Sequence, residues 1–202
     1  MDIDGALARC EAWIFDLDGT LTHAVHDFRQ IADELGLSHE QPILESLAQM
    51  PAGEAAAIHQ RLAQIEHELT QRTRVQDGVC VLLQSLQDRG CRLGILTRNT
   101  RSNAIATLHG VGLADYFHQT DIVGREECAP KPSPEGIHML LSIWRKQAES
   151  AVMIGDYRFD LMAGRAASVR TVLFDPSAGY EWSDLTDHCF SDYQTLHRLA
   201  HP

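Results

Sequence analysis

Short apolar runs alternate with longer helical stretches along most of the chain, and this alternation constrains the fold more than any other feature. The runs are too short for helices and apolar enough to be buried on both faces, like the strands of a parallel sheet. They are Ala12–Phe15, Arg92–Leu96, Thr120–Val123, Ala151–Ile154 and Arg170–Phe174. Helical patterns lie between them at Gly78–Asp88, Arg101–Leu108, Pro134–Lys146 and Asp160–Ala167. The alternation predicts an α/β fold, with a mostly parallel sheet covered by helices on both faces.

The segment between the first two predicted strands breaks this alternation, because residues 22–74 contain no strand candidate. Within it, Ile58, Leu62, Ile65 and Leu69 recur at spacings of four, three and four, which is the pattern of an amphipathic helix. We therefore expect a small all-helical insert over residues 22–74. The α/β core would then consist of residues 1–21 and 75–202.

Composition and charge exclude several kinds of partner. The 202 residues include 17 Lys and Arg against 28 Asp and Glu, and the resulting charge of −11 would repel a nucleic-acid backbone. The five cysteines are scattered without a Cys-x-x-Cys pair, as expected for free thiols in a reducing compartment. The sequence shows no signal peptide and no apolar run near the roughly 18 residues that span a bilayer. We expect a cytoplasmic protein that binds neither nucleic acid nor membranes, and its oligomeric state is not predicted.

Two carboxylates follow the first predicted strand. Asp16 and Asp18 lie one residue apart, and because strand side chains alternate, they would share one face. Gly19 then allows the backbone to turn sharply. An Asp-x-Asp-Gly segment is by itself compatible with a solvated turn, so its meaning depends on the residues at the ends of the other strands.

Polar side chains also follow three later strands. Thr97 and Asn99 come after the second strand, where a hydroxyl and the amides at a helix start can hold an anion or merely cap the helix. Lys131 stands between two prolines after the third strand, and it is one of only two lysines in the chain. Asp156 and Asp160 follow the fourth strand. Ligands of open parallel sheets bind beyond the carboxyl ends of the strands, so these side chains define a candidate site.

The four carboxylates at this edge, Asp16, Asp18, Asp156 and Asp160, would repel one another strongly. Oxygen ligands of this type suit a hard divalent cation such as Mg²⁺. One Mg²⁺ and Lys131 would offset three of the four negative charges, and a protonated Asp18 would remove the last. A phosphoryl dianion then becomes tolerable, and the constellation predicts a metal-assisted phosphoryl site.

The four strand-end segments, in this order, resemble the four motifs of the haloacid dehalogenase superfamily. The resemblance covers roughly residues 10–21 and 75–175. It implies a Rossmann-like three-layer core with a small helical cap domain at residues 22–74, between the first and second motifs. It also implies a Mg²⁺-dependent phosphatase that hydrolyses a small phosphorylated metabolite through an aspartyl-phosphate.

The same resemblance implies roles for four residues in catalysis. Asp16 would be the nucleophile that attacks phosphorus. Asp18 would protonate the leaving oxygen and then activate water. Thr97 would hydrogen-bond the phosphoryl oxygens, while Lys131 would offset their charge and hold Asp16 in place.

The resemblance further implies a set of metal ligands. Mg²⁺ would be bound by an Asp16 oxygen, the backbone carbonyl of Asp18 and Asp156, with Asp160 as a direct or water-mediated ligand.

Substrate-binding residues are expected on both sides of the site. Arg98 and Asn99 follow the motif threonine, and Arg98 stands where many relatives carry a small residue or Asn. In the cap, His23, His26 and Arg29 follow the first motif closely enough to face the cavity, although each is also compatible with a hinge or surface position.

Four other functions have different sequence requirements. A dehalogenase lacks the second aspartate of the first motif, and a phosphonate-cleaving relative needs a cap lysine, but residues 22–74 contain none. A sugar phosphomutase shares all four motifs and remains an alternative, although it too usually uses a cap lysine. A non-catalytic binding domain is a further alternative. It would be supported by a missing nucleophile or metal ligand, but every motif residue is present. Phosphoglycolate is one candidate substrate.

Overall fold

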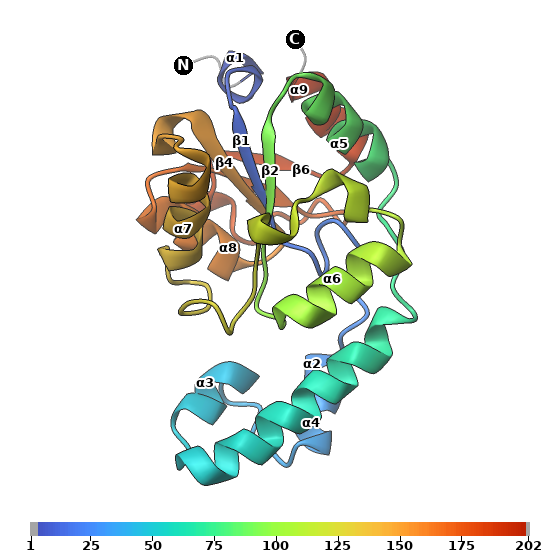
Figure 1. Ribbon diagram of the computed structural model, residues 1–202, viewed down its shortest axis with the longest axis vertical. Coiled ribbons are helices and arrows are strands. Elements are labelled where there is room, and N and C mark those ends of the chain that lie inside the picture. Colours follow the sequence, from blue (N-terminus) through green and yellow to red (C-terminus); the bar gives the residue numbers. More distant parts are fainter. Residues whose placement is uncertain (1–3, 201–202) are drawn as a thin grey trace.

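The computed structural model describes residues 4–200 and contains one six-stranded sheet. The order is β3-β2-β1-β4-β5-β6, and every pair of neighbouring strands is parallel. The predicted α/β class is therefore confirmed (Figure 1). The strands are β1 (Ala12–Phe15), β2 (Arg92–Leu96), β3 (Ile122–Val123), β4 (Ala151–Gly155), β5 (Arg170–Phe174) and β6 (His188–Phe190).

Helices cover both faces of the sheet, because the side chains of the central strand alternate between two hydrophobic clusters. Trp13 and Phe15 of β1 enter one cluster, whereas Ala12 and Ile14 enter the other. The core helices are α1 (Asp4–Ala8), α5 (Val79–Asp88), α6 (Arg101–Gly110), α7 (Glu135–Trp144), α8 (Arg158–Ala166) and α9 (Tyr193–Ala200). Helices α5, α6 and α9 contribute to the first cluster, and α7 and α8 contribute mainly to the second. The result is a three-layer core.

The register of the sheet brings the ends of three strands together. Phe15, the last residue of β1, lies beside Ile95 of β2 and Ile154 of β4. The segments that follow these strands therefore start at one edge of the sheet. This edge carries the polar residues singled out in the sequence.

Local interactions shift some boundaries from the predicted ones. Helix α8 begins at Arg158 rather than Asp160, because the Asp160 carboxylate accepts a hydrogen bond from the Tyr157 N–H and caps the helix from its first turn. Strand β3 is only two residues long, since Gln119–Asp121 form one of four short 3₁₀ turns. The other three turns are Ala114–Tyr116, Ala148–Ser150 and Ser183–Leu185.

The helical insert contains α2 (Phe28–Glu34), α3 (Ile43–Ala48) and α4 (Ala52–Thr70). These helices share a separate small hydrophobic cluster that includes Leu62 and Ile65 of the predicted amphipathic stripe. In Figure 1 the insert lies beyond the carboxyl edge of the sheet, and its longest helix, α4, reaches the core at α6. No helix within residues 4–200 is long and apolar enough to cross a membrane.

Candidate active site

A cavity of about 540 Å³ lies between the carboxyl edge of the sheet and the insert. Core and insert residues both line it, so neither part forms it alone. All but one of the predicted site residues lie around this cavity: Asp16, Asp18, His26, Arg29, Thr97, Arg98, Asn99, Lys131, Asp156 and Asp160.

His23 is the predicted site residue that the structure does not bring to the cavity. Its side chain is exposed, and its backbone N–H donates to the carbonyl oxygen of Arg74 at 2.9 Å. Thr22 and Val75 form an antiparallel bridge beside it. His23 thus lies where the chain enters and leaves the insert, which is the hinge position that the sequence left open for it.

The turn after β1 positions the first two carboxylates. The Asp16 N–H donates to the carbonyl oxygen of Ile154 at 2.8 Å, which extends the sheet pairing to the site. Gly19 has φ +91°, and a Cβ at this position would lie only 2.5 Å from Oδ2 of Asp156. The Thr20 hydroxyl donates to Oδ1 of Asp156 at 2.8 Å. The turn therefore passes so close to Asp156 that only glycine fits, and it holds that carboxylate in place.

Lys131 joins two of the carboxylates. Its Nζ lies 2.7 Å from Oδ1 of Asp16 and 2.5 Å from Oδ1 of Asp160, and its side chain is only 2 % exposed. Burial alone would lower the pKa of Lys131, but the adjacent Asp16 and Asp160 carboxylates raise it above its ordinary value. The Lys131 side chain is therefore held in its charged ammonium form as long as the two carboxylates are ionised.

Asp16, Asp156 and Asp160 form a compact oxygen cluster. One carboxylate oxygen from each lies within 4.8 Å of the others. Burial, together with the charges of Asp16 and Asp160, raises the pKa of Asp156 well above its ordinary value. Burial also raises the pKa of Asp160, to about 6, although Lys131 opposes the shift. Such mutual repulsion is relieved by a bound divalent cation, and a set of hard oxygen donors fits Mg²⁺.

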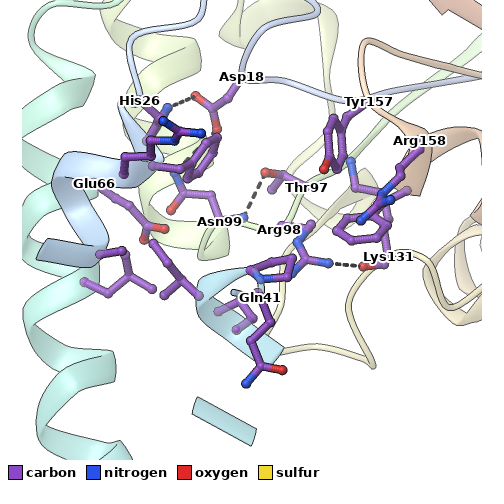
Figure 2. A pocket seen from close by; sticks show the side chains of 18 of the residues that line it. Asp18, His26, Gln41, Glu66, Thr97, Arg98, Asn99, Lys131, Tyr157 and Arg158 are labelled. Atoms are coloured by element: carbon purple, nitrogen blue, oxygen red, sulfur yellow. Dashed lines mark hydrogen bonds and ion pairs between the residues drawn. The ribbon is translucent and has the colours of Figure 1, made fainter. Parts of the chain in front are cut away.

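The side chain of Asp18 lies outside this cluster and faces different partners. Asn99 donates from Nδ2 to Oδ2 of Asp18 at 3.5 Å, and Nδ1 of His26 lies 3.9 Å from Oδ1 (Figure 2). Burial raises the pKa of Asp18, His26 lowers it, and the charge of Asp16 raises it further, with a net upward shift. A carboxyl of this kind holds a proton more readily than a solvated aspartate and can serve as a general acid.

The turn after β2 combines capping with a polar wall for the cavity. The Thr97 hydroxyl oxygen accepts from the Asn99 N–H at 3.0 Å, and the Asn99 side-chain oxygen accepts from the Thr100 N–H at 2.8 Å. Thr100 caps α6 by accepting from the Asn103 N–H at 3.2 Å. The capping interpretation thus applies to Thr100, while Thr97 and Asn99 fix the turn and line the cavity.

Two ion pairs between the insert and the core were not predicted from the sequence. Glu66 of α4 binds Arg125 of the core through two hydrogen bonds of 2.8 and 2.9 Å, and both side chains are less than 10 % exposed. Burial raises the pKa of Glu66 in spite of Arg125. One signal was available in the sequence, because Glu66 follows Leu62 by four residues and so continues the apolar face of its helix.

The second pair joins Glu45 of α3 to Arg98 of the core, at 2.7 Å. Arg98 also donates to the carbonyl oxygen of Lys131 and lies over the ring of Phe159, 4.6 Å from its centroid. Neither Glu45 nor Phe159 stood out in the sequence, because an acid on a helix and an aromatic beside a motif have no distinctive spacing.

Comparison with known proteins agrees with this geometry. Residues 13–174 match the family model of the haloacid dehalogenase-like hydrolases. The chain belongs to this family. The match confirms the resemblance, and relatives named as phosphatases agree with the predicted enzyme class, a phosphatase of the haloacid dehalogenase type.

Relatives and structural neighbours support the assignment. A phosphoglycolate phosphatase of Rhodospirillum rubrum is 31% identical over 198 residues, covering 84% of this chain and 80% of the relative. The pyrophosphatase PpaX of Bacillus pumilus is 36% identical over 50% of this chain and 44% of its own length. A hydrolase from Pseudomonas syringae superposes with a TM-score of 0.77 at 22% identity, covering 95% of this chain and 97% of its own. The last of these similarities concerns the fold alone.

Proposed function

We propose that this protein is a Mg²⁺-dependent phosphatase that hydrolyses a small phosphate monoester through an aspartyl-phosphate on Asp16. The observation that carries the proposal is the meeting of Asp16, Asp18, Asp156 and Lys131 around one cavity. Paired carboxylates with different surroundings, a buried ammonium and an oxygen cluster for a cation together suit phosphoryl transfer.

Asp16 acts as the nucleophile. Lys131 binds its Oδ1, so the second oxygen, Oδ2, is available to attack phosphorus. A bond forms between Oδ2 and phosphorus as the bond from phosphorus to the ester oxygen breaks. Lys131 offsets the charge of the transferring group, and the hydroxyl of Thr97 donates to a phosphoryl oxygen.

Asp18 transfers the protons in both half-reactions. Its raised pKa favours the protonated form, which donates to the leaving alcohol oxygen in the first step. In the second step the ionised carboxylate accepts a proton from water as the water oxygen attacks phosphorus. The bond from phosphorus to Oδ2 of Asp16 then breaks, which releases phosphate and restores the enzyme.

Carboxylates of the core would hold the cation. Asp16 and Asp156 provide oxygens, the backbone carbonyl of Asp18 provides another, and Asp160 acts as a direct or water-mediated ligand. Both oxygens of Asp160 already accept hydrogen bonds, from Lys131 and from the Tyr157 N–H, so it also positions those two groups. When bound, Mg²⁺ neutralises charge on the carboxylates and on the phosphoryl oxygens.

The insert, residues 22–74, serves as the cap of the core formed by residues 1–21 and 75–202. The insert supplies one side of the cavity, including His26 and Arg29, and a closed cap excludes water and selects the substrate. The named activity of the R. rubrum relative makes phosphoglycolate the first substrate to test.

The test is phosphate release from a panel of small monoesters, with and without Mg²⁺. We expect turnover that requires Mg²⁺ and falls at least about 10⁴-fold in Asp16→Asn, because an amide is no nucleophile. The matched control is Asp115→Asn, which changes an exposed aspartate outside the cavity and should keep wild-type activity. Metal-independent turnover, or full activity of Asp16→Asn, contradicts the proposal. Transfer to a second sugar phosphate instead of water identifies a phosphomutase.

A further inference from the structure

The cavity is larger than the smallest phosphate esters require. Its volume of about 540 Å³ falls within the range of roughly 300–1,000 Å³ that is typical of sites for drug-sized ligands. It extends from Asp16 and Asp156 at the sheet edge to residues 38–44 of the insert. The leaving group of phosphoglycolate, a two-carbon acid, would leave much of this space unfilled. The cavity therefore suits a larger leaving group.

Aromatic rings line the core side of the cavity next to the phosphoryl site. Tyr157 and Phe159 come one and three residues after Asp156, and their rings meet edge to face at 5.1 Å. The Tyr157 ring also meets the Trp182 ring edge to face, with the centroids 4.7 Å apart. Tyr157 nevertheless remains 39% exposed. A ring that is held in place but uncovered can stack on a flat ligand without losing further freedom.

A second aromatic pair lies on the side of the insert. His26 and Phe28 stack with centroids 5.6 Å apart and planes inclined by 13°. Phe28 lines the cavity and is 66% exposed, more than any other large hydrophobic side chain within residues 4–200. Figure 2 shows Tyr157 and His26 on opposite sides of the cavity. A flat group between them would cover apolar surface that now faces water.

Two arginines that line the cavity contact an aromatic ring. Arg98 lies in the turn after β2, and its guanidinium already donates hydrogen bonds to the Glu45 carboxylate and to the carbonyl oxygen of Lys131. Arg98 and Arg158 instead lie over the ring of Phe159, at 4.6 and 5.2 Å. Guanidinium groups that stack on aromatic rings also stack on aromatic heterocycles.

We propose that the preferred substrate is a phosphate monoester whose alcohol carries a flat aromatic ring, as a nucleoside 5′-monophosphate does. The ring would lie between the Tyr157–Phe159 pair and the His26–Phe28 pair, while the phosphoryl group reaches Asp16. This inference deepens the proposed phosphatase function and rests on it for the position of the phosphoryl group.

The test compares adenosine 5′-monophosphate with ribose 5-phosphate, which share the phosphoryl group and the sugar and differ only in the ring. We expect kcat/KM with Mg²⁺ to be about tenfold or more higher for the nucleotide, because base stacking on an aromatic side chain contributes on this scale. Dissociation constants for both compounds, measured on Asp16→Asn with Mg²⁺, should show the same order. Pyridoxal 5′-phosphate and phosphoglycolate complete the panel and distinguish a second aromatic ester from a small acid.

A variant links the preference to the rings. Phe28→Leu removes an exposed ring, so folding is not at risk, and it should lower the nucleotide-to-ribose-phosphate ratio several-fold. Val81→Ala on α5, at a side chain that is 61% exposed and outside the cavity, should keep the wild-type ratio.

The possible results separate the two proposals. Equal or better binding and turnover of ribose 5-phosphate or phosphoglycolate would overturn the ring preference and leave the phosphatase function intact. Tighter binding of the nucleotide without any Mg²⁺-dependent hydrolysis would support the ring site and contradict the phosphatase. A ratio unchanged in Phe28→Leu would contradict the placement of the ring.

Discussion

The carboxyl edge of the sheet and the helical insert line the same cavity but hold their side chains in different ways. At the edge, Lys131 binds Asp16, and Thr20 binds Asp156. On the insert, Phe28 is exposed, and Arg29 forms no hydrogen bond or ion pair through its side chain with any residue in 4–200. The difference fits the function proposed above, in which a fixed edge performs the chemistry and a less constrained insert selects the substrate.

The contacts between the insert and the core are polar, whereas the interior of each part is apolar. An apolar cluster packs against each face of the sheet, whereas polar contacts cross from the insert to the core. Glu66 binds Arg125, Glu45 binds Arg98, and Asn103 of α6 donates from Nδ2 to the carbonyl oxygen of Ala63 at 3.0 Å. Interfaces of this polar kind permit relative motion of domains more readily than apolar ones.

Among the variants that change stability as well as activity, the largest expected effect comes from removing the buried ammonium of the edge. Lys131→Met leaves Asp16 and Asp160 buried without their cation, so we expect kcat to fall at least about 10²–10³-fold. Without Mg²⁺, the free energy of unfolding should fall by about 3–5 kcal/mol. The matched control is Lys146→Met, the other lysine of the chain, whose pair with Glu11 is exposed. Steady-state kinetics give kcat, and denaturant unfolding gives the free energy of unfolding, for each variant. Equal losses in Lys131→Met and Lys146→Met would contradict the role of Lys131 at the sheet edge.

The next effect concerns the buried pair between the insert and the core. Arg125→Met leaves Glu66 buried and unpaired, which should lower the free energy of unfolding by about 3–5 kcal/mol. The double variant Glu66→Leu with Arg125→Met should be close to wild type, since an apolar pair removes the buried charge altogether. Denaturant unfolding of both variants tests this. A double variant as unstable as the single one would show that the pair is not responsible.

Binding of Mg²⁺ should stabilise the edge by a smaller amount. At a hundredfold excess over its dissociation constant, a ligand that binds only the folded state adds about 2.7 kcal/mol. We expect Mg²⁺ to raise the melting temperature of the wild type. The shift should disappear in Asp156→Asn but persist in Asp184→Asn, an exposed aspartate elsewhere in the chain. The same shift in both variants would place the metal elsewhere.

The smallest effect is a pH dependence that arises from the insert. The pKa of Glu66 is raised in the folded protein, so between the unfolded and folded values the unfolded state binds fewer protons. This carboxyl therefore makes the free energy of unfolding fall as pH rises from its ordinary value of 4.5 through the folded pKa. Glu66→Gln should show a shallower decline than the wild type under identical conditions. A steeper decline would contradict the sign of the shift.

Much of the fold could be predicted from the sequence because strand and helix periods are local. Ala12–Phe15 and Arg92–Leu96 are strands with the predicted bounds. The stripe through Leu62 and Leu69 lies on one long helix, α4. Less predictable were boundaries that one side-chain cap sets, as at Asp160, whose carboxylate binds the Tyr157 N–H and starts α8 two residues early.

The site residues also fall into two groups, those that the sequence predicts and those that it does not. Asp16, Lys131 and Asp156 could be predicted because each comes after a strand, and the ends of parallel strands meet. The partners Glu45 and Glu66 could not, since they depend on how the insert docks on the core. His23 and His26 show the limit most clearly, because they are three residues apart and only His26 reaches the cavity.

Phosphoenzyme formation at Asp16 is the most direct test of the account. Asp18→Asn is mixed with Mg²⁺ and p-nitrophenyl phosphate, whose leaving group departs without a proton, and the quenched protein is weighed and mapped by mass spectrometry. We predict that one phosphoryl group accumulates on Asp16, because Asp18 is needed to activate water for its release. Phosphoryl transfer to another residue, or undiminished turnover with no phosphoenzyme, would contradict the account.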